Sequence, residues 1–128
     1  MVRVIGGRYK GRLLKTAAGA GTRPTPSMVR EAGFDIIGGS VSGASFLDLY
    51  AGCGAVGIEA LSRGAGFSLF VESGRRSAGI IADNLKAVGA SGCSEVLVLP
   101  VLKALKRISG EGRRFELVFI DPPYADDP

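Results

Sequence analysis

Histidine and tryptophan are both missing from this 128-residue sequence, and cysteine occurs only twice, at Cys53 and Cys93. Without histidine the chain cannot form the Ser–His or Cys–His pairs of nucleophilic catalysis, and a zinc site is not expected. Two cysteines without metal-type spacing are typical of proteins of the reducing cytoplasm. We therefore predict no bound metal and a cytoplasmic location.

Long apolar runs are also missing. The longest run, residues 96–102, is interrupted by Pro100, and it is far shorter than the roughly 20 residues that span a membrane. The amino-terminal residues are too polar and too rich in glycine for a secretion signal. Hydrophobic residues make up 46% of the chain and charged residues 22%, which indicates one globular domain with no membrane segment.

Acidic residues are absent from the first 30 positions, which carry seven basic residues, whereas residues 31–128 hold nine basic and twelve acidic ones. Residues 2–5 and 12–16 predict the two strands of a small basic hairpin. Such an asymmetry indicates an anionic polymer as partner, although a solvated tail is an alternative. We predict RNA contacts by the hairpin residues Arg3, Arg8, Tyr9, Lys10, Arg12 and Lys15.

Residues 46–57, with the sequence FLDLYAGCGAVG, form the stretch around which the rest is organised. An apolar strand pattern is followed by Gly52, Gly54 and Gly57 and then by a short helical pattern. Strand, glycine turn and helix form the first unit of a nucleotide-binding α/β fold. The glycines let a ligand approach the backbone, but a tight strand-to-helix turn without a ligand is the alternative.

Three more strand patterns follow, at residues 68–72, 95–99 and 116–120, with helical patterns between them. This alternation predicts a parallel sheet with helices on both faces. A further helix is expected from Pro26 to about Ile37, with Thr25 as its cap and Val29, Ala32, Ile36 and Ile37 on its apolar face. The expected domains are a basic arm over residues 1–21 and the α/β domain over residues 22–128.

Three candidate sites fall at the carboxyl ends of these strands, where such sheets bind ligands. Glu72 ends the second strand, and its carboxylate suits the two hydroxyls of an adenosine ribose. NAD and S-adenosylmethionine both carry that ribose. Asp121, Pro122, Pro123 and Tyr124 follow the fourth strand, and together they suit a flat base whose amino group is held by hydrogen bonds and whose face is stacked.

The runs IGGRYKGRLL, TRPTPSMVREAGFDII, FLDLYAGCGAVGIEALSRGA, FVE and DPPY together resemble the bacterial 16S rRNA guanine-N(2) methyltransferases, the RsmD-like group. The resemblance is collinear over nearly the whole chain. It implies a Rossmann-like class I methyltransferase fold and methylation of a guanine amino group in 16S ribosomal RNA of a small-subunit assembly particle, with S-adenosylmethionine as cofactor.

Residue by residue, the resemblance implies a catalytic loop at Asp121, Pro122, Pro123 and Tyr124. It implies cofactor contacts by Asp48, Tyr50, Gly52, Gly54, Gly57, Glu72, Arg23 and Thr25. This chain departs from the family pattern at Ser27, Met28 and Gly33. It also has Pro100 after the third strand, where many relatives place an acid for the adenine, so no adenine-binding residue is assigned.

Three alternatives remain open on the sequence alone: another amino methyltransferase acting on nucleic acid or a protein amide, an NAD-binding oxidoreductase, and a non-catalytic RNA-binding module. Only four residues follow Tyr124, and only four strands of an expected seven are present. We therefore expect a shortened enzyme that is weak or inactive and that self-associates through the open edge of its fourth strand.

Overall fold

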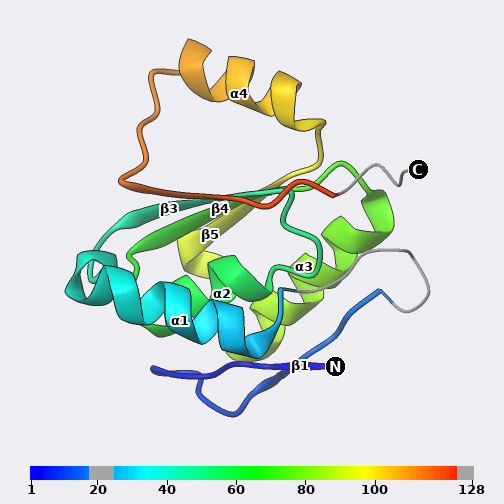
Figure 1. Cartoon of the computed structure of the whole chain (residues 1–128). Coiled ribbons are helices and arrows are strands. Elements are labelled where there is room, and N and C mark those ends of the chain that lie inside the picture. The colour runs from blue at the N-terminus through cyan, green and yellow to red at the C-terminus, as the bar shows by residue number, and fades with distance from the viewer. Residues whose placement is uncertain (18–24, 124–128) are drawn as a thin grey trace.

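The computed structural model describes residues 1–17 and 25–123. A four-stranded sheet lies at the centre of the molecule (Figure 1). Helices α1 (Ser27–Ile37), α2 (Ala55–Ser62) and α3 (Arg75–Val88) cover one face, and α4 (Val101–Gly110) covers the other. The hairpin of β1 (Val2–Arg3) and β2 (Leu13–Leu14) lies on the outer side of the three-helix layer, away from the sheet.

The sheet has the order β5 (Ser94–Leu97), β4 (Phe67–Val71), β3 (Ser45–Leu49) and β6 (Leu117–Ile120), and all its strand pairs are parallel. This confirms the predicted parallel sheet with helices on both faces. The first strand of the sheet pairs with both the second and the fourth. Two short 3₁₀ turns, η1 (Gly38–Val41) and η2 (Ser91–Cys93), lead into β3 and β5. Among the residues described, no helix is long and apolar enough to cross a membrane.

Alternation along β3 builds a core on each side of the sheet, because successive side chains of a strand point to opposite faces. Phe46 packs toward the three-helix layer, whereas Leu47 and Leu49 pack with Ala104 and Ile108 of α4. The Asp48 side chain lies on the same face as Phe46, beneath the glycine turn that follows the strand.

Helix α2 is buried on all sides, since every residue from Ala55 to Ser62 is inaccessible to solvent. The sheet covers its inner side and the hairpin covers its outer side (Figure 1). A helix that is buried all round is expected to be apolar all round, so the two polar residues on it, Glu59 and Ser62, require partners. Both find them in the hairpin, and these contacts dock the arm on the domain.

Helix α1 differs from the sequence expectation in two respects. Pro26 and not Thr25 is the cap, and no side chain caps the helix. Arg30 and Phe34 form its buried face, whereas Val29 and Ile36 are 57% and 85% exposed. The pattern of apolar residues was misleading because the position that faces the core holds an arginine.

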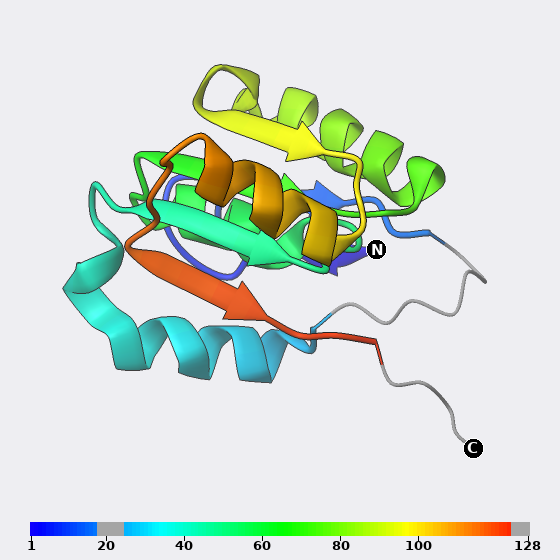
Figure 2. The ribbon, with the colours of Figure 1, turned by 90° about the horizontal axis from the view of Figure 1, so that it is seen from above.

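Strand β6 lies at one edge of the sheet, with β3 as its one strand neighbour among the described residues. Figure 2 shows α4 lying over the middle of the sheet, with β6 at the side that α4 leaves uncovered. Val118 and Ile120 are accordingly 49% and 62% exposed. On the other face an apolar groove of about 200 Å³ lies between α1 and β6.

Candidate cofactor and nucleic-acid site

The candidate site lies where three neighbouring strands end. Glu72 follows β4, the glycine turn of residues 52–54 follows β3, and Asp121 follows β6. Because β4, β3 and β6 are adjacent and parallel, their carboxyl ends share one edge of the sheet. The structure therefore brings together groups that are separated by up to 69 positions in the sequence.

The glycines of the turn serve different purposes. Gly52 has φ +59, and a Cβ there would meet no atom within 4 Å, so open space lies beside the backbone. A Cβ on Gly57 would lie 2.3 Å from the Phe70 ring, so this glycine permits close packing of α2 on the sheet. The first position fits a ligand cradle, and the second is a packing position.

Glu72 ties the turns after β3 and β4 together. Its Oε1 accepts a hydrogen bond from Gly52 N at 2.8 Å, and its Oε2 accepts one from Gly74 N at 2.9 Å. A carboxylate offers about four lone-pair positions, so both oxygens keep capacity for further donors. Half-buried Glu72 thus fits a ligand with two neighbouring hydroxyls, and the residues present fit a ribose-containing cofactor.

Asp48 lies under the glycine turn and is only 1% exposed. Its Oδ2 accepts a hydrogen bond from Gly57 N at 2.9 Å, which satisfies one of the free N–H groups at the start of α2. Burial, together with the nearby carboxylates of Glu72 and Asp121, raises the pKa of Asp48 to about 8. Burial also raises the pKa of the Cys53 thiol in the same turn, so Asp48 and Cys53 both favour their neutral forms.

Tyr50 connects β3 to the glycine turn with a backbone conformation that non-glycine residues seldom adopt. Its φ of 58° lies in the left-handed region, which costs about 1–2 kcal/mol for an L-residue and is frequent at ligand sites. The side chain is 39% exposed. This strain turns the chain sharply at the end of β3 and leaves the ring accessible beside the turn.

Asp121 meets the segment that precedes α1. Thr25 Oγ1 lies 3.5 Å from Asp121 Oδ2, at the long limit of a hydrogen bond. Pro122 and Pro123 follow and are exposed. The predicted site residues Arg23 and Tyr124 lie outside the described residues. The structure thus brings together Thr25 and Asp121, two predicted site residues that are 96 positions apart in the sequence.

The hairpin presents its basic side chains to solvent, since Arg3, Arg8, Lys10, Arg12 and Lys15 are all exposed. Some of them also bond the protein: Arg3 Nη1 donates to Gly11 O at 3.0 Å, and Arg12 Nη2 donates to Ala87 O. Tyr9 was predicted to contact RNA together with these residues, but it is only 8% exposed and belongs to the core. The cationic side chains of the hairpin are therefore accessible to solvent, whereas the Tyr9 ring is not.

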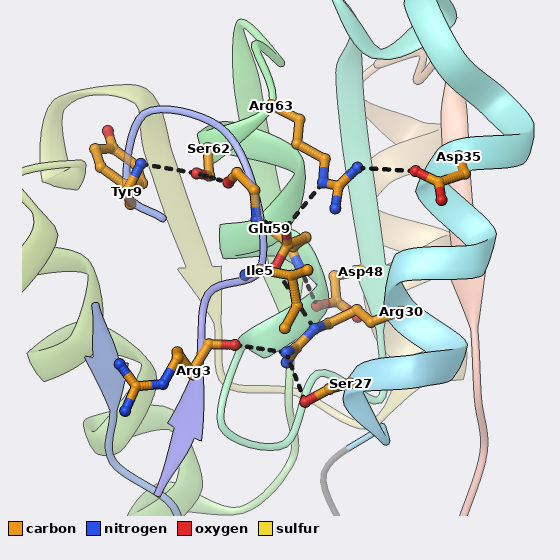
Figure 3. Close-up of polar contacts among 12 residues, drawn as sticks. Arg3, Ile5, Tyr9, Ser27, Arg30, Asp35, Asp48, Glu59, Ser62 and Arg63 are labelled. Atoms are coloured by element: carbon orange, nitrogen blue, oxygen red, sulfur yellow. Dashed lines mark hydrogen bonds and ion pairs between the residues drawn. The ribbon is translucent and has the colours of Figure 1, made fainter. Parts of the chain in front are cut away.

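A buried ion pair that sequence analysis missed fastens the hairpin to α1 and α2 (Figure 3). Glu59 accepts hydrogen bonds from Ile5 N and Gly6 N, each at 3.0 Å, and from Arg63 Nε at 2.8 Å. Arg30 Nε lies 3.5 Å from Glu59 Oε1, and both side chains are fully buried. Burial lowers the pKa of Arg30, and Glu59 opposes this shift. Arg30, one of the seven basic residues in the first 30 positions, is therefore not exposed to solvent.

Groups of histidine, cysteine and carboxylate residues that could hold a metal ion are absent from residues 1–17 and 25–123. The site consists of a glycine turn, a carboxylate that joins two loops, and an acid after the fourth strand. These features, on a parallel sheet of this order, define a Rossmann-like nucleotide-binding domain.

The chain belongs to the family described as Conserved hypothetical protein 95, whose model matches residues 2–128. It is 39% identical over 125 residues to YlbH of Bacillus subtilis, provisionally named as an rRNA methyltransferase, covering 98% of this chain and 68% of that protein. It is 34% identical over 123 residues to ribosomal RNA small subunit methyltransferase D of Escherichia coli, covering 96% of this chain and 60% of that protein. The resemblance to the RsmD-like group is confirmed.

Solved structures confirm the fold. The hypothetical protein TTHA0928 of Thermus thermophilus superposes with a TM-score of 0.88 at 36% identity, covering 99% of this chain and 72% of that one. SMU.776, a Streptococcus mutans protein titled as a methyltransferase and complexed with SAH, shares the fold at a TM-score of 0.68 and 23% identity, over 80% of this chain and 27% of its own. At this identity the likeness to SMU.776 shows the fold alone; the expected cofactor, S-adenosylmethionine, agrees with the methyltransferase names of the curated relatives. The chain spans 60–68% of the length of the two curated relatives above.

Proposed function

We propose that this protein methylates the exocyclic N2 amino group of a guanine in 16S ribosomal RNA, with S-adenosylmethionine as methyl donor. The observation that carries the proposal is the meeting of Glu72, the glycine turn and Asp121 at the carboxyl ends of three adjacent strands. Relatives named as rRNA methyltransferases support it. The substrate is an assembly particle of the small subunit, and the place of action is therefore the cytoplasm.

The cofactor lies across the glycine turn in this proposal. Glu72 binds the ribose hydroxyls, Gly52 and Gly54 allow the ligand to approach the backbone, and the exposed Tyr50 ring borders the site. Asp48 shapes the turn from beneath through its bond to Gly57. When bound, the cofactor supplies an electrophilic methyl group. Arg23 and Thr25 approach its methionine end.

Asp121 and the Pro122 carbonyl accept the two hydrogens of the guanine amino group. These bonds raise the electron density on the nitrogen and stabilise the positive charge that develops as it attacks the methyl carbon. The two prolines stiffen the loop, and Tyr124 stacks on the base. Thr25 limits the motion of Asp121 through their contact. Positioning of the two reactants supplies most of the acceleration.

The deciding experiment incubates the chain with labelled S-adenosylmethionine and 30S particles that lack the modification, followed by nucleoside analysis. We expect label in N2-methylguanosine. Asp121→Ala slows the transfer by about 10²–10³-fold while cofactor binding persists, whereas Glu111→Gln, at the exposed end of α4 on the opposite face of the sheet, retains the wild-type rate. Label in adenine or in protein would identify another amino methyltransferase. Binding of NAD without binding of S-adenosylhomocysteine would identify an oxidoreductase, and RNA binding without transfer a binding module.

RNA binding is tested separately on the hairpin. Replacement of Arg8, Lys10 and Arg12 by alanine should weaken binding and lower the slope of log K against log salt by about 0.9 for each duplex phosphate that the variant no longer neutralises. The matched control removes three cations from α4, on the opposite face of the sheet (Lys103, Lys106 and Arg107), and should leave the slope unchanged. Equal slopes for the hairpin variant and wild type would assign the hairpin to folding or to a protein contact.

A further inference from the structure

Asn84 of α3 lies between the end of the hairpin segment and the glycine turn. It is only 2% exposed. Its Oδ1 accepts a hydrogen bond from Lys15 N at 2.8 Å, and its Nδ2 donates to Lys15 O and to Cys53 O, each at 3.0 Å. One buried side chain therefore contacts the backbone of the proposed RNA-binding arm and the backbone of the proposed cofactor turn.

The chemistry of this position selects an amide. An asparagine presents one acceptor oxygen and two N–H donors, and here the oxygen meets an N–H group while the two hydrogens meet two carbonyls. An aspartate has nearly the same shape, but its second carboxylate oxygen is an acceptor and would face the carbonyl oxygens of Lys15 and Cys53 without a hydrogen to donate. An alanine would leave three backbone groups without this partner, and buried polar groups without partners are costly.

The contact with Cys53 acts on the conformation of the turn. The Cys53 carbonyl and the Gly54 N–H belong to one planar peptide unit. Gly54 N donates to Ala51 O at 2.9 Å, so Ala51 and Asn84 hold the two ends of this unit. Gly54 has φ +85 and precedes the first residue of α2. Asn84 thereby helps to determine how the turn presents its backbone.

The side chains of α2 that bind the hairpin do not contact the glycine turn. Glu59 and Ser62 bond the hairpin backbone between Ile5 and Tyr9, and both lie in the second half of α2. Lys15 differs, because its backbone meets Asn84 while its side chain is 62% exposed and lies 3.8 Å from Asp83 at the surface. An RNA phosphate can therefore reach the same residue whose backbone is tied to the turn.

We propose that Asn84 is a positioning residue that couples RNA binding by the hairpin segment to cofactor binding by the glycine turn. The inference rests on the proposed function, because it requires both ligands. RNA that restrains Lys15 also restrains Asn84 and the peptide unit between Cys53 and Gly54, so less conformational freedom is lost when the cofactor binds. By thermodynamic linkage, the cofactor strengthens RNA binding by the same factor.

The test is equilibrium dialysis of labelled S-adenosylhomocysteine against the full chain, alone and with saturating 30S particles that lack the modification. For wild type, RNA should tighten cofactor binding by at least about 5-fold, the lower end of typical coupling. For Asn84→Ala and Asn84→Asp the ratio of the two affinities should fall to about 1. A merely structural role would weaken both affinities and leave their ratio unchanged.

Asp83→Asn is the matched control. It removes the surface partner of the Lys15 side chain and leaves the amide contacts in place, so the coupling ratio should stay at the wild-type value. A wild type that binds both ligands with a ratio of 1, or Asn84 variants that keep the wild-type ratio, would overturn the inference alone. A wild type that fails to bind either ligand would overturn the proposed function.

If neither Asn84 variant folds, hydrogen exchange on wild type decides. Saturating RNA, without cofactor, should slow exchange of the peptide amides at residues 52–57. Unchanged exchange there, with RNA bound, would overturn the inference.

Discussion

Replacement of Glu59 by glutamine removes the charge at the centre of the contacts that dock the hairpin. The side chains of Glu59 and Arg30 are both fully buried, with Glu59 Oε1 and Arg30 Nε 3.5 Å apart. Removing one partner of such a pair leaves an uncompensated buried charge and costs about 3–5 kcal/mol. That is a large part of the roughly 5–15 kcal/mol by which domains are stable.

Loss of Arg30 should cost less than loss of Glu59. In Arg30→Met, Glu59 keeps Arg63 and the backbone N–H groups of Ile5 and Gly6. Arg30 Nη1 has no hydrogen-bond partner among the described residues, so its removal also removes an unsatisfied polar group. The expected order of stability is therefore wild type, then Arg30→Met, then Glu59→Gln.

The assay is urea unfolding followed by far-ultraviolet circular dichroism, because the chain has no tryptophan to report by fluorescence. Glu111→Gln serves as the control, since the side chains of Glu111 and Arg107 are 46% and 55% exposed, and such pairs contribute about 0.2–1 kcal/mol. A Glu59→Gln variant that loses no more stability than this control would refute the reasoning that the hairpin is docked by a buried charge.

Three further predictions concern the site and the sheet edge. Burial raises the pKa of Asp48 from 3.8 to about 8. The folded state is therefore increasingly destabilised relative to the unfolded state as pH rises from about 4 to about 8. The thermal unfolding temperature of Asp48→Asn should match that of wild type at pH 4 and exceed it at pH 9. A constant difference across this range would contradict the burial argument. Glu72→Ala should weaken binding of S-adenosylhomocysteine by about one to two decades in calorimetry, since hydrogen bonds to a charged group contribute about 1.5–3 kcal/mol. An unchanged affinity would mean that Glu72 only connects the loops after β3 and β4. Among the described residues, β6 pairs with β3 alone. Its other edge and the exposed Val118 should drive self-association of the chain, visible by light scattering. Val118→Lys should reduce this self-association because charged side chains protect sheet edges. A wild-type chain that stays monomeric at high concentration and transfers methyl groups at full rate would refute this expectation and that of a weak or inactive enzyme.

Local patterns predicted much of the fold. In α3, Ile81, Leu85 and Val88 recur at helical spacing, and all three are buried as expected. The strand ends that carry Glu72 and Asp121 were also located correctly, because parallel strands alternating with helices leave few possible topologies. The family resemblance added the proposed roles of individual site residues, which periodicity alone does not provide.

The interpretation of α1 and of the hairpin was less successful, because both depend on contacts between residues distant in sequence. Arg30 is buried because Glu59, on a different helix, compensates its charge. Tyr9 packs in the core, where its backbone N–H donates to Ser62 on α2. Thr25 was expected to cap α1, but its hydroxyl lies near Asp121, 96 positions further along the chain.

The sequence by itself determined the α/β class, the glycine turn with Glu72 at its side, and the concentration of positive charge at the amino terminus, because these follow from short-range pattern and composition. Only the tertiary structure decided which charges are exposed at the surface and which are buried in the core. It also decided that Asn84 joins the arm to the turn. The physical reason is that a buried polar side chain is tolerated only where the fold supplies its partners, and those partners are chosen by packing between distant segments.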